Sequence, residues 1–438
     1  MRDLILIGVV IIASLIAIRR PVFGILAYLC FGIINPQGMV WEYGRTFPLA
    51  MLTALGTIAG YLFWREPKYF PKHREVFLLM LLWVTFAVST PLAIYPDEAY
   101  DRLIHTSKIL LMVFLTMLII NSETRLHLMI KTIALSLGAL GFKGGIFAIV
   151  TGGSLMVFGP DLGFLASNNM IGLALAMNLP LLVYVLKREQ NKYLQWLTRG
   201  MIVLSYPAVV CTFSRGAWIG LAAATALLVL KGRRKFVMVT VLAVVASLAV
   251  PYLPERVSTR YDDLRNYQEE SSAQSRLWNW EFCKRVGLAN PLHGGGFNFY
   301  SFESYARFYP EFLERWPGKV WTCHSTWMTI LGEHGLIAFF IWIGLLLSCL
   351  LSLRRIAAYA RERPDKEWVA HYANAVQIAI VSYLVVATFL DAAYFDMFYE
   401  LLASLVIAKE ILRRQATQEA EKARLLKMQQ AMPFSRAS

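Results

Sequence analysis

The sequence contains little charge. Of its 438 residues, 16% are Asp, Glu, Lys or Arg, while 57% are apolar. Soluble chains carry about 25% charged residues, and apolar runs long enough to cross a bilayer recur along nearly the whole length. These features exclude a disordered chain, a soluble enzyme with one membrane anchor, and the short alternating strands of an outer-membrane barrel. The sequence therefore predicts an all-α polytopic membrane protein.

Several motifs of other enzyme classes are missing. No nucleotide-binding motif is present, so ATP-driven transport is not expected, and no Gly-X-Ser-X-Gly elbow or acidic metal-type cluster is found. The five cysteines are odd in number and lack the spacing of a disulfide or zinc framework. Cys283 and Cys323 share one predicted outer loop, where a disulfide and two buried thiols are both open.

Thirteen apolar runs are candidate transmembrane helices, and because the first two are short, we expect 12 or 13 spans. Backbone groups in lipid must be paired within the segment, which requires helices. The runs are Leu4–Ile18, Val22–Ile34, Phe47–Trp64, Val76–Ile94, Ile104–Ile120, Leu128–Val150, Met170–Leu186, Met201–Phe213, Ala217–Leu230, Phe236–Tyr252, Thr326–Leu353, Ala370–Leu390 and Tyr394–Leu412.

The distribution of Lys and Arg predicts the orientation. One alternating set of connections, together with the C-terminal tail, holds 28 of these residues, and three short connections of the opposite set hold 2. Positively charged loops stay in the cytoplasm. We therefore expect a cytoplasmic C-terminus, whereas the side of the N-terminus depends on the helix count.

One long connection belongs to the outer set. Leu253–Thr322 has 70 residues, nine of them Lys or Arg, and long loops cross regardless of charge. It is rich in Trp, Tyr and Phe, which suit a headgroup-level or sugar-facing surface, and Ser271–Lys284 is expected to be an amphipathic helix. The predicted organisation is a helix bundle at 1–252, a periplasmic loop domain at 253–322, transmembrane helices at 323–412 and a cytoplasmic tail at 413–438.

Three cations lie in or at the ends of apolar runs: Lys108, Lys143 and Arg215. Charge at that depth is costly and indicates a functional site. Arg215 stands between Ser214 and Gly216 in a predicted outer turn, where its planar fork of donors suits a phosphate. The alternative is an arginine that reaches only to the headgroups.

The other two cations differ in their surroundings. Lys143 lies near the outer end of its helix beside Gly144 and Gly145, which allow close approach of a ligand or a helix. Lys108 is expected to pair with Asp101 or to extend outward to the interface. We therefore count Lys143, and not Lys108, among the candidate ligand-binding residues.

Two further candidates lie on the predicted outer face. His324 stands where the long loop re-enters the membrane, and an imidazole there can act as a base near neutral pH. Cationic neighbours such as Arg276 lower the pKa of a histidine and favour its neutral form. A purely structural role for His324 is the alternative. His334 lies ten residues further on and is expected to point elsewhere, which disfavours a shared metal.

These motifs follow one another in an order similar to that of a known family. Ser214-Arg215-Gly216 comes between two helices, followed by the loop with Arg276 and Gly294-Gly295-Gly296, and then by His324-Ser325-Thr326-Trp327 before Leu331–Ile337. Ser167-Asn168-Asn169 ahead of Pro180 is similar to the family's Asn-containing helix start. The chain thus resembles the bacterial O-antigen ligases (lipopolysaccharide core ligases), which are related to O-antigen polymerases and O-oligosaccharyltransferases.

The resemblance implies a GT-C-like membrane glycosyltransferase in the bacterial inner membrane with a periplasmic site. It implies transfer of a glycan from undecaprenyl diphosphate to the lipid A–core oligosaccharide, without metal, cofactor or nucleic acid. His324 would take the proton of the acceptor hydroxyl, with inversion at the anomeric carbon. Arg215, Arg276, Lys143 and Arg265 would stabilise the charge on the diphosphate.

Two other functions remain open at this point. A polymerase or a protein O-oligosaccharyltransferase would use the same site with another acceptor. A transporter of anionic lipid or glycan would need polar residues at the midplane and broken helices, for which Lys108 and Asp391 are the only support.

Overall fold

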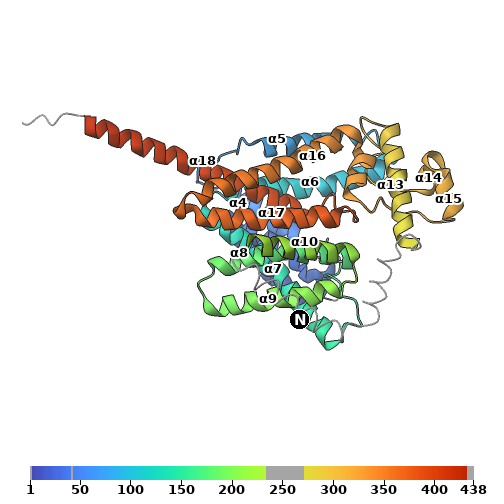
Figure 1. Ribbon diagram of the computed structural model, residues 1–438, viewed down its shortest axis with the longest axis horizontal. Coiled ribbons are helices and arrows are strands. Elements are labelled where there is room, and N and C mark those ends of the chain that lie inside the picture. The colour runs from blue at the N-terminus through green and yellow to red at the C-terminus, as the bar shows by residue number, and fades with distance from the viewer. Residues whose placement is uncertain (1, 41–42, 233–270, 432–438) are drawn as a thin grey trace, which may run out of the picture.

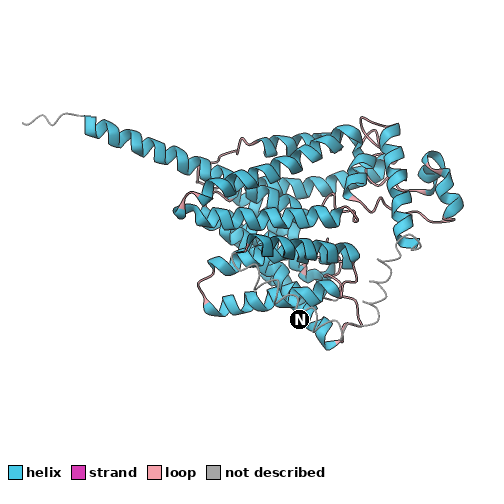
Figure 2. Ribbon diagram, viewed as in Figure 1, coloured by secondary structure: helices cyan, strands magenta, loops and turns pink. Residues whose placement is uncertain are grey.

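The computed structural model describes residues 2–40, 43–232 and 271–431, and these residues form helices joined by loops (Figures 1 and 2). The α-helices are α1 (Arg2–Arg19), α2 (Pro21–Ile34), α3 (Tyr43–Thr46), α4 (Leu49–Leu62), α5 (Arg74–Ser89), α6 (Pro96–Ile119), α7 (Glu123–Val150), α8 (Asn168–Arg188), α9 (Lys192–Val210), α10 (Arg215–Lys231), α13 (Ser271–Ala289), α14 (Phe302–Phe308), α15 (Pro310–Arg315), α16 (Thr326–Arg361), α17 (Glu367–Ala387) and α18 (Asp396–Ala431). Short 3₁₀ turns lie at Pro36–Met39 and Pro364–Lys366.

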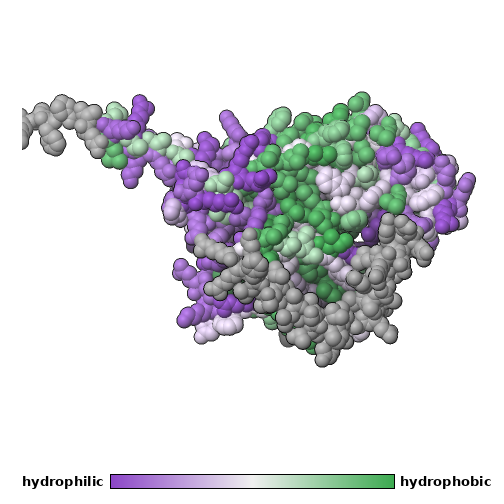
Figure 3. All heavy atoms as spheres, viewed as in Figure 1, coloured by the Kyte–Doolittle hydropathy of each residue, from purple (hydrophilic) through white to green (hydrophobic). Residues whose placement is uncertain are grey.

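The apolar runs correspond to helices wherever the structure describes them. Twelve of the thirteen predicted runs coincide with α1, α2, α4–α10 and α16–α18, and the remaining run, Phe236–Tyr252, lies outside the described residues. Within the described residues, six segments are long and apolar enough to cross a membrane: Pro21–Gly38, Pro96–Ile119, Glu123–Val150, Asn168–Arg188, Thr326–Arg361 and Pro364–Ala387. Figure 3 shows the matching pattern, an apolar band between two hydrophilic ends.

Several helices extend beyond their apolar runs. Helix α6 begins at Pro96, so Arg102 is helical and not part of an outer connection, and α16 continues to Arg361. A polar helical turn makes the same backbone hydrogen bonds as an apolar turn. Hydropathy therefore identifies only the apolar part of each helix and not its polar ends. Helix α18 likewise runs without a break from the predicted last span into the tail.

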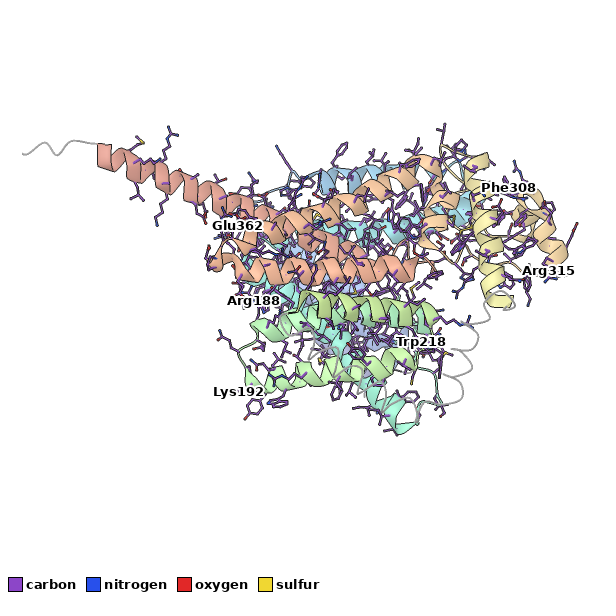
Figure 4. The ribbon with its side chains drawn as sticks, in the orientation of Figure 1. Arg188, Lys192, Trp218, Phe308, Arg315 and Glu362 are labelled. Atoms are coloured by element: carbon purple, nitrogen blue, oxygen red, sulfur yellow. A yellow bond between two sulfur atoms is a disulfide. The ribbon has the colours of Figure 1, made fainter. Side chains whose placement is uncertain are left out.

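The two ends of the bundle differ in the residues they present. Figure 4 places Arg188, Lys192 and Glu362 at one end, and Trp218, Phe308 and Arg315 at the other. At the first end, the Arg125 guanidinium binds Glu66 at 2.6 Å and lowers the pKa of that carboxyl. The loops predicted to be cytoplasmic and those predicted to be external therefore separate to opposite ends.

A kink interrupts α16 close to its start. Gly335 adopts φ 75° and ψ −171° inside the helix, which frees neighbouring backbone carbonyls from their helical partners. The backbone N–H of Gly295 donates to Gly332 O at 2.7 Å, and that of Gly296 donates to Glu333 O at 2.8 Å. The glycine run therefore supplies hydrogen-bond donors to the carbonyls that the kink leaves free. A side chain at Gly294 would collide with the Glu333–His334 backbone.

Helices α13, α14 and α15 form a small aromatic core beyond one end of the bundle (Figure 1). Phe282 of α13 stacks on Tyr305 with ring centroids 3.7 Å apart, and Phe312 lies 4.3 Å from Tyr305. A disulfide joins Cys283 of α13 to Cys323, which settles the alternative left open by the sequence. It ties the outer helices directly to the residue that precedes His324.

Candidate functional site

His324 lies between the disulfide and the first turn of α16. Its backbone is left-handed, with φ 49°, which is uncommon for a residue other than glycine. Its N–H donates to Oδ2 of Asp391 at 3.1 Å, and its ring Nδ1 lies 4.0 Å from the same oxygen. The carboxylate thus holds the backbone of His324 and faces the Nδ1 side of its ring, beyond hydrogen-bond distance, while Nε2 is the nitrogen turned away from the carboxylate.

Asp391, in the turn between α17 and α18, is the residue that sequence reasoning missed. Its two oxygens accept hydrogen bonds from the hydroxyls of Thr322 and Thr329, in addition to the His324 N–H. A carboxylate that accepts from this many donors is fixed in place. In the sequence, Asp391 is an acidic residue between two apolar runs, and that pattern by itself gives only weak support for a transporter.

The surroundings of His324 keep its imidazole neutral. Burial lowers the pKa of His324 and the positive charge of Arg276 lowers it further, while Asp391 opposes both effects. The ring is nevertheless 41% exposed, so a ligand can reach it. A neutral, accessible imidazole oriented by a carboxylate has the properties of a general base.

Arg215 begins α10 at the same end of the bundle as His324. Ser214 caps the helix, and a side chain at the next residue, Gly216, would contact Val386 and Phe389, at the end of α17 just before Asp391. The ring of Phe389 also lies 6.1 Å from that of Trp280 in α13. The start of α10 and Trp280 of α13 therefore both lie next to Phe389, two residues before Asp391.

The Asn-containing start of α8 supports the same turn. The side-chain amide of Asn168 donates to the carbonyl of Thr212 at 2.9 Å. Phe213, the next residue, has φ 52°, so the chain reverses sharply before Ser214 caps α10. Two separate sequence motifs of the resemblance thus meet in one contact that positions Arg215.

The other three residues predicted to bind the diphosphate differ in where the structure places them. Arg276, on α13, is half-buried and close enough to His324 to act on it electrostatically. Lys143 is exposed on α7 and is not among the residues that line the cavity described below. Arg265 lies outside the described residues. The structure therefore brings Arg276 close to His324, and the diphosphate-binding roles of Arg215, Arg276, Lys143 and Arg265 stay predictions.

A cavity of about 880 Å³ opens beside Asp391. One part of its wall is apolar and comes from α2, α4 and α6, including Leu29, Ala54 and Met112. The other part is polar and contains, besides Asp391 and its partners Thr322 and Thr329, the side chains of Asn298, Tyr300, Glu333, Tyr394, Asp396, Glu400, Arg102, His105 and Lys108. A cavity with these two halves suits an amphiphile whose headgroup reaches the carboxylate that holds His324.

A buried hydrogen-bond chain leads away from the cavity through α16. Glu333 lines the cavity and accepts from the hydroxyl of Tyr394, which lies 2.7 Å from His334 Nε2. His334 Nδ1 in turn lies 2.6 Å from the hydroxyl of Ser89 on α5. His334 is fully buried, and both of its ring nitrogens are occupied by these two hydroxyls. Among the residues described, no three His, Cys, Asp or Glu side chains converge as a metal site.

Comparison with known families agrees with this geometry. Residues 200–343, which include Arg215, Arg276 and His324, match the O-antigen ligase family, a family of membrane glycosyltransferase-like ligases. Residues 1–190 match a family described only as one of unknown function. No curated protein matches the sequence. Residues 200–343 are therefore similar to the O-antigen ligase family, and this match supports an activity of the ligase or polymerase type.

Proposed function

We propose that the protein is an O-antigen ligase that transfers a glycan from undecaprenyl diphosphate to the lipid A–core oligosaccharide. The observation that carries the proposal is the position of His324, held by Asp391 where the polar wall of an amphiphilic cavity begins. A ligase of this kind must bring a membrane-bound hydroxyl to a base at the bilayer surface. The match of residues 200–343 to the O-antigen ligase family supports the same activity.

The transfer is an in-line displacement at the anomeric carbon. Nε2 of His324 takes the proton of the acceptor hydroxyl as its oxygen forms the new glycosidic bond. The bond from the anomeric carbon to the diphosphate breaks, and its electron pair leaves with the diphosphate. Because the acceptor attacks from the side opposite the leaving group, the configuration inverts. Asp391 stabilises the imidazolium that forms on His324.

Fixed cations stabilise the leaving group. Negative charge grows on the diphosphate as its bond to the sugar breaks, and preorganised cations lower the energy of that charge most where water is excluded. We assign this role to Arg215, at the start of α10, and to Arg276 on α13, whose charge acts on His324. In the proposal Lys143 and Arg265 assist them, and no metal or cofactor takes part.

The proposed location is the bacterial inner membrane, with the site in the periplasm and the C-terminus in the cytoplasm. The strong excess of Lys and Arg in one set of loops supports this orientation. A reporter that is active only in the periplasm tests it: we expect no signal when it is fused after Ser438 and a signal when it is inserted after Gly318. The opposite pair of results would reverse the orientation.

The decisive experiment uses purified protein, an undecaprenyl-diphosphate-linked glycan and lipid A–core in the presence of a chelator. We expect a covalent glycan–lipid A–core product from the wild type and none from His324→Ala. Two further arms offer a lipid-linked glycan or a protein as the acceptor. Product only in one of those arms would make the protein a polymerase or a protein O-oligosaccharyltransferase, and movement of lipid across proteoliposomes without a product would make it a transporter.

A further inference from the structure

The region that matches a family of unknown function builds most of the cavity. The apolar wall comes from α2, α4 and α6, and all three helices lie within residues 1–190. On α6, Arg102, His105 and Lys108 recur every third residue and all face the cavity. Residues at that spacing lie on one side of a helix. The N-terminal region therefore presents a basic stripe, Arg102–His105–Lys108, beside an apolar surface.

The two cations of the stripe lack close acidic partners among the described residues. Neither Arg102 nor Lys108 has a carboxylate within 4.0 Å among the described residues, although both line a cavity in a membrane protein. Arg102 lies over the ring of Tyr394 at 5.4 Å, and its charge acts on Glu333 and Asp396 at longer range. A charge placed at such depth indicates an ion or a substrate. The chemical complement of this stripe is an anion such as a phosphate.

Another part of the cavity wall, on α18, carries carboxyl groups that indicate a second kind of recognition. Asp396 and Glu400 lie one turn apart on α18, and both line the cavity. Glu400 is 4% exposed, and its Oε2 has no hydrogen-bond partner among the described residues. Leaving a buried acceptor without a partner is unfavourable, and a donor from a ligand would remove that cost. Sugar hydroxyls are such donors, whereas a bare diphosphate offers none.

We propose that the basic stripe on α6 is a phosphate subsite for a phosphorylated glycolipid. The phosphate lies on Arg102, His105 and Lys108, the sugar hydroxyls donate to the carboxyls of α18, and the acyl chains lie against α2 and α4. This assigns a lipid-binding role to the region of unknown function. The inference rests on the proposed function for the identity of that lipid, the acceptor, because Asp391, which binds the backbone of His324, lines this cavity, while Arg215 and Arg276 do not.

Equilibrium binding tests the subsite without requiring turnover. The protein in nanodiscs is titrated with three labelled probes: bisphosphorylated lipid A, undecaprenyl diphosphate and uncharged undecaprenol. We compare Lys108→Met, which removes the charge and keeps an apolar stem, with Lys108→Arg, which keeps the charge, and use Arg102→Gln as a second probe of the stripe. Each variant is first checked for the wild-type thermal unfolding temperature.

We expect Lys108→Met to weaken lipid A binding about fivefold or more, the loss that goes with about 1 kcal/mol per basic residue. Lys108→Arg and all undecaprenol titrations should match the wild type. Weaker binding of undecaprenyl diphosphate, and not of lipid A, would overturn the assignment to a glycolipid and leave the subsite to the donor. Wild-type binding of both phosphorylated lipids by Lys108→Met and by Arg102→Gln would overturn the subsite itself.

One competing explanation is that Lys108 merely balances the carboxyls of α18. In that case a second substitution, Glu400→Gln, would restore lipid A binding to Lys108→Met, and such a rescue would overturn the proposal. We expect no rescue, because the double variant Lys108→Met/Glu400→Gln still lacks the positive charge of Lys108 that binds the phosphate. The binding result stands whether or not the protein joins a glycan to lipid A–core, so failure here and failure of the ligase assay are distinguishable.

Discussion

Asp391 Oδ2 accepts the backbone N–H of His324 at 3.1 Å across 67 residues of sequence. The same carboxylate accepts hydroxyl donors from Thr322 and Thr329, on either side of His324. One side chain therefore joins the turn after α17 to the loop that enters α16. The position of the imidazole depends on this link, because His324 adopts a left-handed backbone conformation that needs support from its surroundings.

The first prediction concerns that carboxylate. Asp391→Asn keeps the shape of the side chain and removes its charge, so we expect kcat to fall by a factor on the order of 10 to 100, part of the 10²–10⁴ that a positioned base contributes. Asp391 is also the one group that raises the pKa of His324. Its loss should move the acid limb of kcat/KM to lower pH. The measurement is a pH–rate profile of glycan transfer.

Asp365→Asn is the matched control, because Asp365 is an exposed carboxylate three residues after Glu362, which lies at the opposite end of the bundle (Figure 4). It should leave both kcat and the pH profile as in the wild type. A loss of activity in Asp391→Asn with an unmoved acid limb would show that Asp391 matters only for folding.

The second prediction concerns Arg276, whose charge lowers the pKa of His324. Arg276→Gln should raise that pKa, so the imidazole is protonated, and activity lost, at a higher pH than in the wild type. If Arg276 also stabilises the leaving diphosphate, kcat at the optimum should fall by about 10²–10³. Arg276→Lys retains the charge and should keep the acid limb in place while it recovers only part of kcat. A wild-type profile for Arg276→Gln would contradict both roles.

The sequence predicted the helices and the sidedness of the site better than it predicted the wall of the cavity. Hydropathy reports which residues leave water, so the twelve described runs became helices, and the charge of the loops placed Arg215 and His324 at one end. Neither signal reports which helices are neighbours. In the sequence, Asp391 and Arg102 lie in short stretches between apolar runs, and nothing in the sequence places them together. They line one cavity only because α6, α16 and α18 pack together.

Lys108 shows the same limit. From the sequence it was expected to pair with Asp101 or extend to the interface, and in the structure it lines the cavity instead. The glycine run was recognised as part of a motif, but its purpose was not visible. Gly295 and Gly296 donate hydrogen bonds to carbonyls of α16 that are free because the helix is kinked at Gly335. No local sequence pattern predicts that kink.

The third prediction uses that glycine run. Gly296 has φ 82°, and a Cβ there would overlap Ala93 in the turn between α5 and α6. We expect Gly296→Ala to destabilise the protein by about 1–2 kcal/mol for the left-handed backbone and about 1–3 kcal/mol more for the overlap. Gly318→Ala is the control, because Gly318 has φ 69° and no atom within 4 Å of its Cβ position. Thermal unfolding in detergent compares them, and equal losses would show that Ala93 moves aside freely.

The fourth prediction concerns the disulfide between Cys283 and Cys323, which closes a loop of 40 residues. Chain entropy alone gives such a loop about 4 kcal/mol of stability. The double variant Cys283→Ser/Cys323→Ser should therefore unfold at a lower temperature than Cys30→Ser, which removes a half-buried free thiol. It should also lose most transfer activity, because Cys323 precedes His324 and Tyr300 donates to its sulfur at 3.3 Å. If the double variant kept the unfolding temperature and activity of Cys30→Ser, the aromatic core of α13–α15 alone would be enough to position His324.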